Sequence, residues 1–321
     1  MRRQLRRRSG TLLPTMKVAY EKMAGLYVFC RIGRRFGERV SGMRLRFAFL
    51  LFADTAAVSI PLSAANAHSL KLGKGRRSFP SIQAAIDVAQ TGYTIELQST
   101  HTYTENIQLF PPVAAKELTI VGGRSTAIDG GGRDCVLQID AGYTLRLSNV
   151  SLRNGKCQRG GGISNSGTLH LDKVIVSGNQ GTQGGGGIFN ADGASLELTH
   201  TVVQGNQSAD PTAGMGGGIL NLGTANIEES VGSGNTAAVR GGGFENAGVS
   251  LILRQATVSG NTTQGNGGGI DISAGSRGQP LTALIRTLVS KNTAASGGGI
   301  FNGASQIDPK VSLIQNNTPN N

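Results

Sequence analysis

Two carboxylates, Glu245 and Asp271, occupy the same position in consecutive copies of a repeated phrase, GGGFEN and GGGIDI. If these copies form neighbouring parallel strands, the two side chains stack about 4.7 to 4.9 Å apart. Like charges at that distance raise one of the two pKa values, which suits a general acid, and two carboxylates can also share a calcium ion. Arg240, just before GGGFEN, could neutralise the pair or bind a uronate. Glu245, Asp271 and Arg240 are therefore the candidate catalytic residues.

The spacing is compatible with glycoside cleavage, because retaining glycosidases hold their carboxyl groups about 5 to 5.5 Å apart. The same column of the repeat also contains Phe189, Leu220 and Phe301, and we expect the column to point outward. A phenylalanine there could support a sugar ring, and three aligned apolar side chains could form a binding face for a partner. The structural alternative is that an exposed column tolerates almost any residue and that Arg240 only relieves two solvated acids.

Two other groups of polar residues have a plain interpretation. His170 and Glu197 occupy corresponding positions in adjacent repeats, where they could act as an acid/base pair but are expected to form a surface hydrogen bond. Asp129 and Asp134 are typical of aspartates that stabilise tight turns.

The repeat itself predicts the architecture. Copies of the phrase GGG-I-x-N follow one another at intervals of roughly 25 to 31 residues, which is the range of solenoid repeats. Between the copies, runs such as LHLDKVIVSGN from Leu169 alternate apolar and polar residues, as half-buried strands do. Helical periodicity is absent from this region. The sequence predicts an all-β fold, a parallel β-helix whose coils bury their inward side chains against their neighbours.

Asparagines recur at two positions of the repeated unit. Stacked amides can donate to and accept from one another, so each series is expected to form a hydrogen-bonded structural ladder rather than a functional site. The first series is Asn165, Asn190, Asn221, Asn246 and Asn302, and the second is Asn179, Asn206, Asn235, Asn261, Asn292 and Asn317. Ile272 stands where the first series would have another asparagine.

The N-terminal end of the repeat region predicts a cap. Ser81 can cap a helix over residues 82–90, in which Ile82, Ala85, Ile86 and Ala89 fall on one stripe. An amphipathic helix at this point would cover the exposed end of the first coil, which would otherwise invite pairing with other chains.

Charge and hydropathy divide the chain at residue 67. The formal net charge is +12, but residues 1–67 hold 13 Lys or Arg and three acids, which leaves 18 basic and 16 acidic residues for the rest. Without a basic stripe interleaved with aromatics, nucleic acid is not an expected partner. We divide the chain into a basic leader over residues 1–67 and one β-helix domain over 68–321, with cap and first coils at 68–150 and Gly/Asn-rich coils at 151–321.

The leader has the order of a secretory signal peptide. A basic start at Met43 is followed by an apolar run and by Ala65-Asn66-Ala67, a small-x-small cleavage site. We expect translation from Met43, cleavage after Ala67 and no membrane span thereafter. Export would permit a disulfide between Cys135 and Cys157, which precede corresponding strands about one coil apart. Two cysteines alone make no zinc site, so no metal is firmly predicted.

The segments SIQAAIDVAQTGYTIEL, YTENIQL, ELTIVGG and IDGGG resemble the opening of pectin-lyase-like right-handed parallel β-helix proteins. The GGG-I-x-N phrases resemble the repeats of polymorphic outer membrane proteins, and together the resemblances cover roughly residues 79–317. They imply a right-handed β-helix found in lyases, hydrolases, esterases and non-catalytic surface proteins. The chain lacks a paired DD typical of polygalacturonases and a constellation resembling that of pectin methylesterases.

From the sequence we therefore expect a monomeric, secreted or cell-envelope protein, exposed in the periplasm, on the outer surface or outside the cell. Its function is expected to be non-catalytic and adhesin-like, with a rigid face that binds a polysaccharide or a surface protein and no required cofactor. The alternative is a polysaccharide lyase or glycoside hydrolase that uses Glu245, Asp271 and Arg240, with calcium as a possible cofactor.

Overall fold

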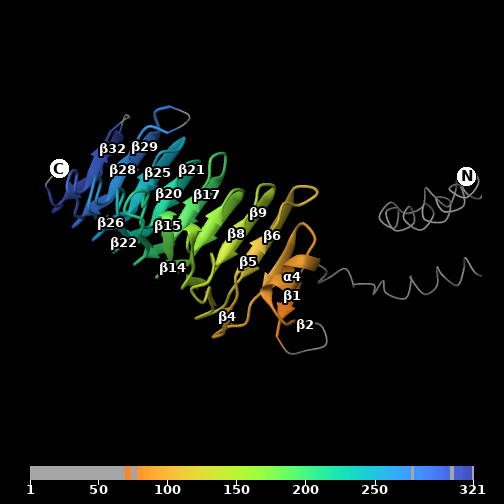
Figure 1. Ribbon diagram of the computed structural model, residues 1–321. Coiled ribbons are helices and arrows are strands. Elements are labelled where there is room, and N and C mark those ends of the chain that lie inside the picture. Colours follow the sequence, from red (N-terminus) through yellow and green to blue (C-terminus); the bar gives the residue numbers. More distant parts are fainter. Residues whose placement is uncertain (1–68, 74–77, 276–277, 304–306, 320–321) are drawn as a thin grey trace, which may run out of the picture. The chain divides into compact units, whose positions relative to one another are not determined.

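Residues 69–73, 78–275, 278–303 and 307–319 are described by a computed structural model. They form a single right-handed parallel β-helix of about nine turns, and Figure 1 shows its coils following one another from β1 to β32. The predicted leader, with its start at Met43 and its cleavage site, lies outside the described residues. Within them, no helix combines the length and the apolar character needed to cross a membrane.

From β3 to β31 each coil visits sheets A, B and C, and the middle coils also visit a small sheet D. Sheet A contains β1 (Ser69–Leu72), β2 (Ser78–Phe79), β3 (Tyr93–Glu96), β6 (Lys116–Val121), β9 (Tyr143–Ser148), β13 (Thr168–Asp172), β17 (Ser195–Thr199), β21 (Thr224–Glu228), β25 (Ser250–Arg254), β29 (Leu281–Ile285) and β32 (Ile307–Lys310). Sheet B contains β4 (Thr102–Thr104), β7 (Ala127–Asp129), β10 (Ser151–Arg153), β14 (Ile175–Ser177), β18 (Val202–Gln204), β22 (Val231–Ser233), β26 (Thr257–Ser259), β30 (Leu288–Ser290) and β33 (Leu313–Gln315).

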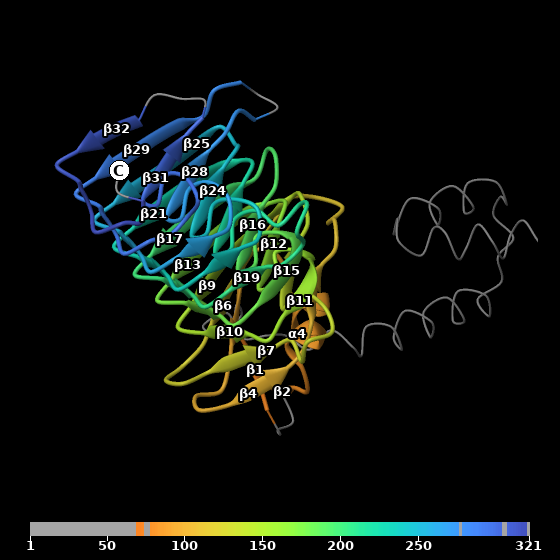
Figure 2. The same cartoon turned by 60° about the vertical axis from the view of Figure 1, so that its left-hand side comes forward.

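Sheets C and D contain the glycine-rich part of each repeat. Sheet C is built from β5 (Ile107–Leu109), β8 (Leu137–Ile139), β12 (Ile163–Asn165), β16 (Ile188–Asn190), β20 (Ile219–Asn221), β24 (Phe244–Asn246), β28 (Ile270–Ile272) and β31 (Ile300–Asn302). Sheet D is built from β11 (Lys156–Arg159), β15 (Gln180–Gly184), β19 (Gln207–Ser208), β23 (Thr236–Ala237) and β27 (Thr262–Thr263). All strand pairs in the four sheets are parallel, and Figure 2 shows the coils stacked along the helix axis.

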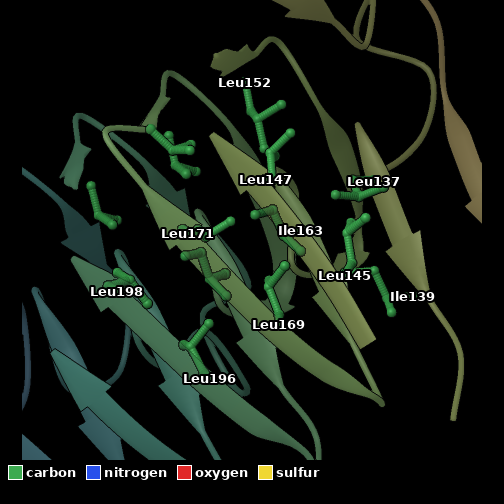
Figure 3. Close-up of a cluster of buried hydrophobic side chains, with 14 of the residues drawn as sticks. Leu137, Ile139, Leu145, Leu147, Leu152, Ile163, Leu169, Leu171, Leu196 and Leu198 are labelled. Atoms are coloured by element: carbon green, nitrogen blue, oxygen red, sulfur yellow. The ribbon is translucent and has the colours of Figure 1, made fainter. Parts of the chain in front are cut away.

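The core follows from the alternation in the sequence. Leu169 and Leu171 of β13 point inward and stack in register on Leu196 and Leu198 of β17. Figure 3 shows these side chains beside others from sheets B and C, such as Leu152 and Ile163. Each inward position therefore continues as a column of buried side chains, which no single coil could shield alone.

The predicted cap is present as helix α4 (Ile82–Val88). Its N-cap is Ser81, whose side chain accepts a hydrogen bond from the backbone of Ala84 at 3.1 Å. Ile82, Ala85 and Ile86 are buried against the first coil. The carboxylate of Glu105 adds acceptors for the free N–H groups of the first turn, including that of Ile82 at 3.0 Å.

The second asparagine ladder is confirmed, and the first is confirmed from Asn165 to Asn246. Asn302, which follows the gap at Ile272, is exposed at the end of sheet C. In the second ladder, each side-chain amide donates to the Oδ1 of the next asparagine, as from Asn206 to Asn235 at 3.0 Å and from Asn235 to Asn261 at 3.0 Å. The same Oδ1 also accepts the backbone N–H of the preceding member. In the first ladder, Asn165 donates to Asn190 at 2.8 Å and Asn221 donates to Asn246 at 2.8 Å. The ladders satisfy polar groups that the corners of the coils bury.

The first ladder is interrupted at Ile272 in a compensated way. Asn246, which precedes the gap, donates instead to the Oγ1 of Thr282 at 3.0 Å. Thr282 occupies an inward position of sheet A that is leucine or alanine in the preceding coils, as at Leu251 and Ala225. Ile272 replaces an asparagine in sheet C, and Thr282 replaces an apolar residue in sheet A. The buried side-chain amide of Asn246 therefore keeps a hydrogen-bond acceptor.

A second compensation lies between sheets B and C. The inward position of sheet B is valine at Val203 and Val258 but glycine at Gly232. A Cβ added to Gly232 would lie 2.4 Å from Cζ of Phe244, which takes the place of the isoleucine found in the neighbouring coils. The ring of Phe244 fills the volume that the missing side chain leaves.

Replacing Gly232 with valine should overpack this coil and lower the free energy of unfolding by about 2 to 3 kcal/mol. Phe244→Ile should also be destabilising, because it leaves a cavity beside Gly232. The double variant rebuilds the arrangement of the adjacent coils, and urea denaturation should show that it is more stable than either single variant. Additive losses in the double variant would contradict this interpretation.

The predicted disulfide is also confirmed. Cys135 and Cys157 are bonded, with their Cα atoms 5.1 Å apart. The bond links the coil that contains β8 to the first strand of sheet D, β11. Closing a loop of this length removes entropy from the unfolded chain that corresponds to roughly 3 kcal/mol.

Candidate functional site

The column that contains the candidate residues is covered, so the expectation that it faces solvent is wrong. Glu245 and Asp271 are 0% and 1% exposed, and Phe189 and Leu220 are 7% and 4% exposed. Phe301, in the last strand of sheet C, is half-buried. Phe189, Leu220 and Phe301 therefore do not form an open apolar binding face.

The cover is a line of residues that each precede a GGG triplet. Gly184, Met215, Arg240, Asn266 and Ser296 pair in parallel from coil to coil, and we call them the cover ladder. The glycine after each has a positive φ, for example +63° at Gly241, which folds the chain back over sheet C. A Cβ on Gly241 would lie 2.9 Å from Cβ of Glu245. The first glycine of the triplet thus allows the backbone to pass directly over the column.

Strands β24 and β28 bring the two acids together. Glu245 and Asp271 are register partners, as the sequence predicts, and Arg240 of the cover ladder approaches from outside. The Nε of Arg240 lies 3.2 Å from Oε1 of Glu245, and its Nη2 lies 3.1 Å from the sulfur of Met215. The hydroxyl of Ser273 donates to the same Oε1. The sequence thus predicted three members of this cluster and missed Ser273, which lies two residues beyond Asp271.

The cluster holds a proton at neutral pH. Burial, followed by the negative charge of Asp271, raises the pKa of Glu245 to about 8, although Arg240 and Ser273 act in the opposite direction. Burial also raises the pKa of Asp271, while a hydrogen bond from Glu245 lowers it. Oε2 of Glu245 and Oδ2 of Asp271 have no other donor. Glu245 is therefore protonated at neutral pH, which keeps two negative charges from facing each other beside Arg240.

A protonated carboxyl beside a carboxylate is chemically suited to acid catalysis, but access decides what this pair can reach. A polysaccharide cannot contact side chains that are 0% and 1% exposed. Arg240, with 36% of its side chain exposed, and the partly buried Ser273 connect the cluster to the surface. The catalytic role of the three residues stays a prediction, and so does calcium, for which the Arg240 guanidinium competes at Glu245.

The other polar candidates lie elsewhere. His170 and Glu197 form a hydrogen bond of 2.6 Å between β13 and β17 of sheet A, in earlier coils than the acidic pair. Asp129 accepts the backbone N–H of Gly131 at 3.0 Å and Asp134 accepts that of Cys135 at 2.7 Å, which confirms that both stabilise turns.

Two features escaped the sequence analysis. His200, at the turn after β17, lies 3.3 Å from Asp172 and 2.7 Å from Glu229, and so links three successive coils. Its column could have been found by aligning the first of the two residues that separate sheets A and B in each of these coils. Among the described residues, one group of three possible metal ligands occurs, Asp134 with Cys135 and Cys157, and the disulfide engages both of its sulfurs.

Comparison with protein-family models, with curated proteins and with solved structures finds no match to this chain.

Proposed function

We propose that this protein is a non-catalytic, exported β-helix that presents a rigid surface to glycans, in the manner of an adhesin. The observation that carries the proposal is the enclosure of Glu245 and Asp271 beneath the cover ladder. An acidic pair that a sugar chain cannot touch acts as part of the fold rather than on a substrate.

Export is supported by two observations. The leader over residues 1–67 has the order of a signal peptide. Cys135 and Cys157 form a disulfide, a bond that persists in oxidising compartments and is rare where thiols are kept reduced. A surface or extracellular location and a monomeric state belong to the same proposal.

The competing function is that of a polysaccharide lyase or hydrolase. The observation in its favour is a carboxyl group with a pKa of about 8 beside a partly exposed arginine. It would require the cover ladder to open, although each of its members is joined to an adjacent coil by backbone pairing.

The proposal is tested by glycan binding. The mature chain is applied to an array of neutral, carboxylated, sulfated and phosphorylated glycans, and bound sugars are then eluted and sized. We expect retention of at least one glycan class with the sugar recovered intact. Failure to bind any glycan would overturn the proposal, and recovery of shortened sugars would favour the competing enzyme.

A further inference from the structure

A groove on the early coils provides a binding site that is separate from the acidic pair. It has a volume of about 750 Å³ and lies where the chain passes from sheet A to sheet B. One wall is formed by the turns between the two sheets and the other by the outer face of sheet B, including Ser151 and Arg153 of β10.

The groove results from a change in turn length. In the first two coils, the turns from sheet A to sheet B span residues 97–101 and 122–126. In the next two coils they shorten to residues 149–150 and 173–174. The longer turn projects beyond its shorter neighbours and forms a lip, and the lining residues Arg124 and Ser125 lie on that lip.

The lining is cationic. It includes Arg124, Arg153 and Lys173 and contains no aspartate or glutamate. Arg153 is held by Asp129, whose Oδ2 lies 3.0 Å from its Nε, and Lys173 lies 3.5 Å from Asp172. The guanidinium of Arg124 makes no hydrogen bond or ion pair with the described residues. The hydrogen-bond donors of the Arg124 guanidinium are thus available to a ligand.

Asp129 fixes one side of the site. Burial alone would raise the pKa of Asp129, but hydrogen bonds from Gly131, Asn154 and Arg153 hold it below its usual value. An acid that accepts three hydrogen bonds remains ionised and keeps Arg153 in place at the wall of the groove.

Neutral donors complete the lining. The side chains of Ser125, Asn149 and Ser151 line the groove without a hydrogen bond to the described residues. Hydroxyl and amide groups beside guanidinium and ammonium groups can bind the hydroxyls of a sugar together with an anionic substituent. No aromatic side chain lines the groove, which removes the stacking platform that single-stranded nucleic acids need.

We propose that this groove binds a sugar bearing a tetrahedral oxyanion, a sulfate or a phosphate ester. The donors come from two opposing walls rather than from one bidentate fork, and an ester with three free oxygens can accept from several directions at once, whereas a carboxylate offers two coplanar oxygens. The inference rests on the proposed glycan-binding function and names the class of sugar and the place where it binds.

The test is titration calorimetry of the mature chain with a sulfated oligosaccharide, a phosphorylated oligosaccharide, a polygalacturonate oligomer, a neutral oligomer and single-stranded DNA. Arg124→Gln and Lys173→Asn remove cationic groups from the groove. Asparagine is chosen because Lys173 has a φ of +54°, a conformation that asparagine tolerates. Arg286→Asn is the matched control, since Arg286 has a φ of +52° at the equivalent turn of a later coil outside the groove.

We expect the sulfated or the phosphorylated sugar to bind. Comparison of their affinities shows whether the groove prefers a sulfate or a phosphate ester. Arg124→Gln and Lys173→Asn should each weaken binding about tenfold and reduce its salt dependence, and Arg286→Asn should leave it unchanged. Equal binding by all variants would show that the sugar does not bind in the groove, while leaving the proposed glycan-binding function intact. Preferential binding of the carboxylated or neutral oligomer, or of DNA, would overturn the ligand class, and no binding to any sugar would overturn the proposed function as well.

Discussion

Replacing Asn235 with alanine should lower the free energy of unfolding by about 3 to 5 kcal/mol. Asn235 is 0% exposed, and its Oδ1 accepts from both the backbone N–H and the side chain of Asn206 at 3.0 Å. Its own amide donates to the carbonyl of Val203 at 3.0 Å and to Asn261 at 3.0 Å. Truncation would strand buried donors that water cannot reach, and each such group costs about 1 to 3 kcal/mol.

Chemical denaturation measures the overall effect, and amide hydrogen exchange locates it. The N–H of Asn206 donates to Asn235, so its protection should fall most, whereas amides several coils away should change little because coils contact only their neighbours. The matched control is Asn226→Ala, since Asn226 accepts one hydrogen bond from Arg254 on the outer face of sheet A. A loss as large in Asn226→Ala as in Asn235→Ala would show that the ladder is not the source of the stability.

The second large effect concerns pH. Glu245 has a folded pKa of about 8, above the ordinary value of 4.5, so between these values the folded state binds more protons than the unfolded state. Stability must therefore fall as pH rises through this window, and we expect a decrease of about 3 kcal/mol or more between pH 5 and pH 9. The physical reason is that deprotonation places two negative charges in an enclosed site with one arginine.

Glu245→Gln isolates this effect. Glutamine has the shape of a protonated glutamate, can donate to Asp271 and can accept from Ser273 and Arg240. Thermal unfolding at a series of pH values should show the variant close to the wild type at pH 5 and more stable than the wild type at pH 9. Glu117→Gln, which alters a half-exposed acid paired with Arg146, serves as the control and should keep the slope of the wild type. A Glu245→Gln variant that loses stability with pH as steeply as the wild type would contradict the protonated pair.

Much of the fold could be predicted because the spacing of the repeats determines the register of the strands. Every GGG-I-x-N phrase aligns with the next, so the stacking of Asn165 on Asn190 and of Glu245 on Asp271 follows from counting residues. The cap was predictable for a local reason, since Ser81 and the apolar stripe that follows it lie within one short segment. The disulfide was predictable from chain order rather than from register, because its cysteines precede the corresponding strands β8 and β12 by different numbers of residues.

The exposure of the candidate site could not be predicted in the same way. A period of two shows that Phe189 and Glu245 point away from the core, but it does not show what lies outside them. The cover depends on a positive φ at residues such as Gly241, which folds the preceding segment over sheet C. The sequence shows that a glycine permits such a turn, but not that the turn is made. This is a property of the three-dimensional path of the chain.

Compensations between distant residues were invisible for a related reason. In the sequence, Gly232 is an unfavourable strand residue and Phe244 differs from the isoleucine of the other repeats. Their contact in the structure shows that the small residue makes room for the large one. Thr282 and Ile272 are a similar pair. The groove near Arg124 depends on the relative lengths of successive turns, which matter only once the coils are stacked.

The central claim is that the acidic pair supports the fold and does not act on a substrate. The most direct measurement follows new chain ends or unsaturated products from uronic-acid and neutral polysaccharides, with calcium present, for the wild-type chain and the Glu245→Gln variant. We predict no product from either protein and a folded variant by circular dichroism. Product formation by the wild type that disappears in the folded Glu245→Gln variant would contradict the claim and identify Glu245 as a catalytic residue.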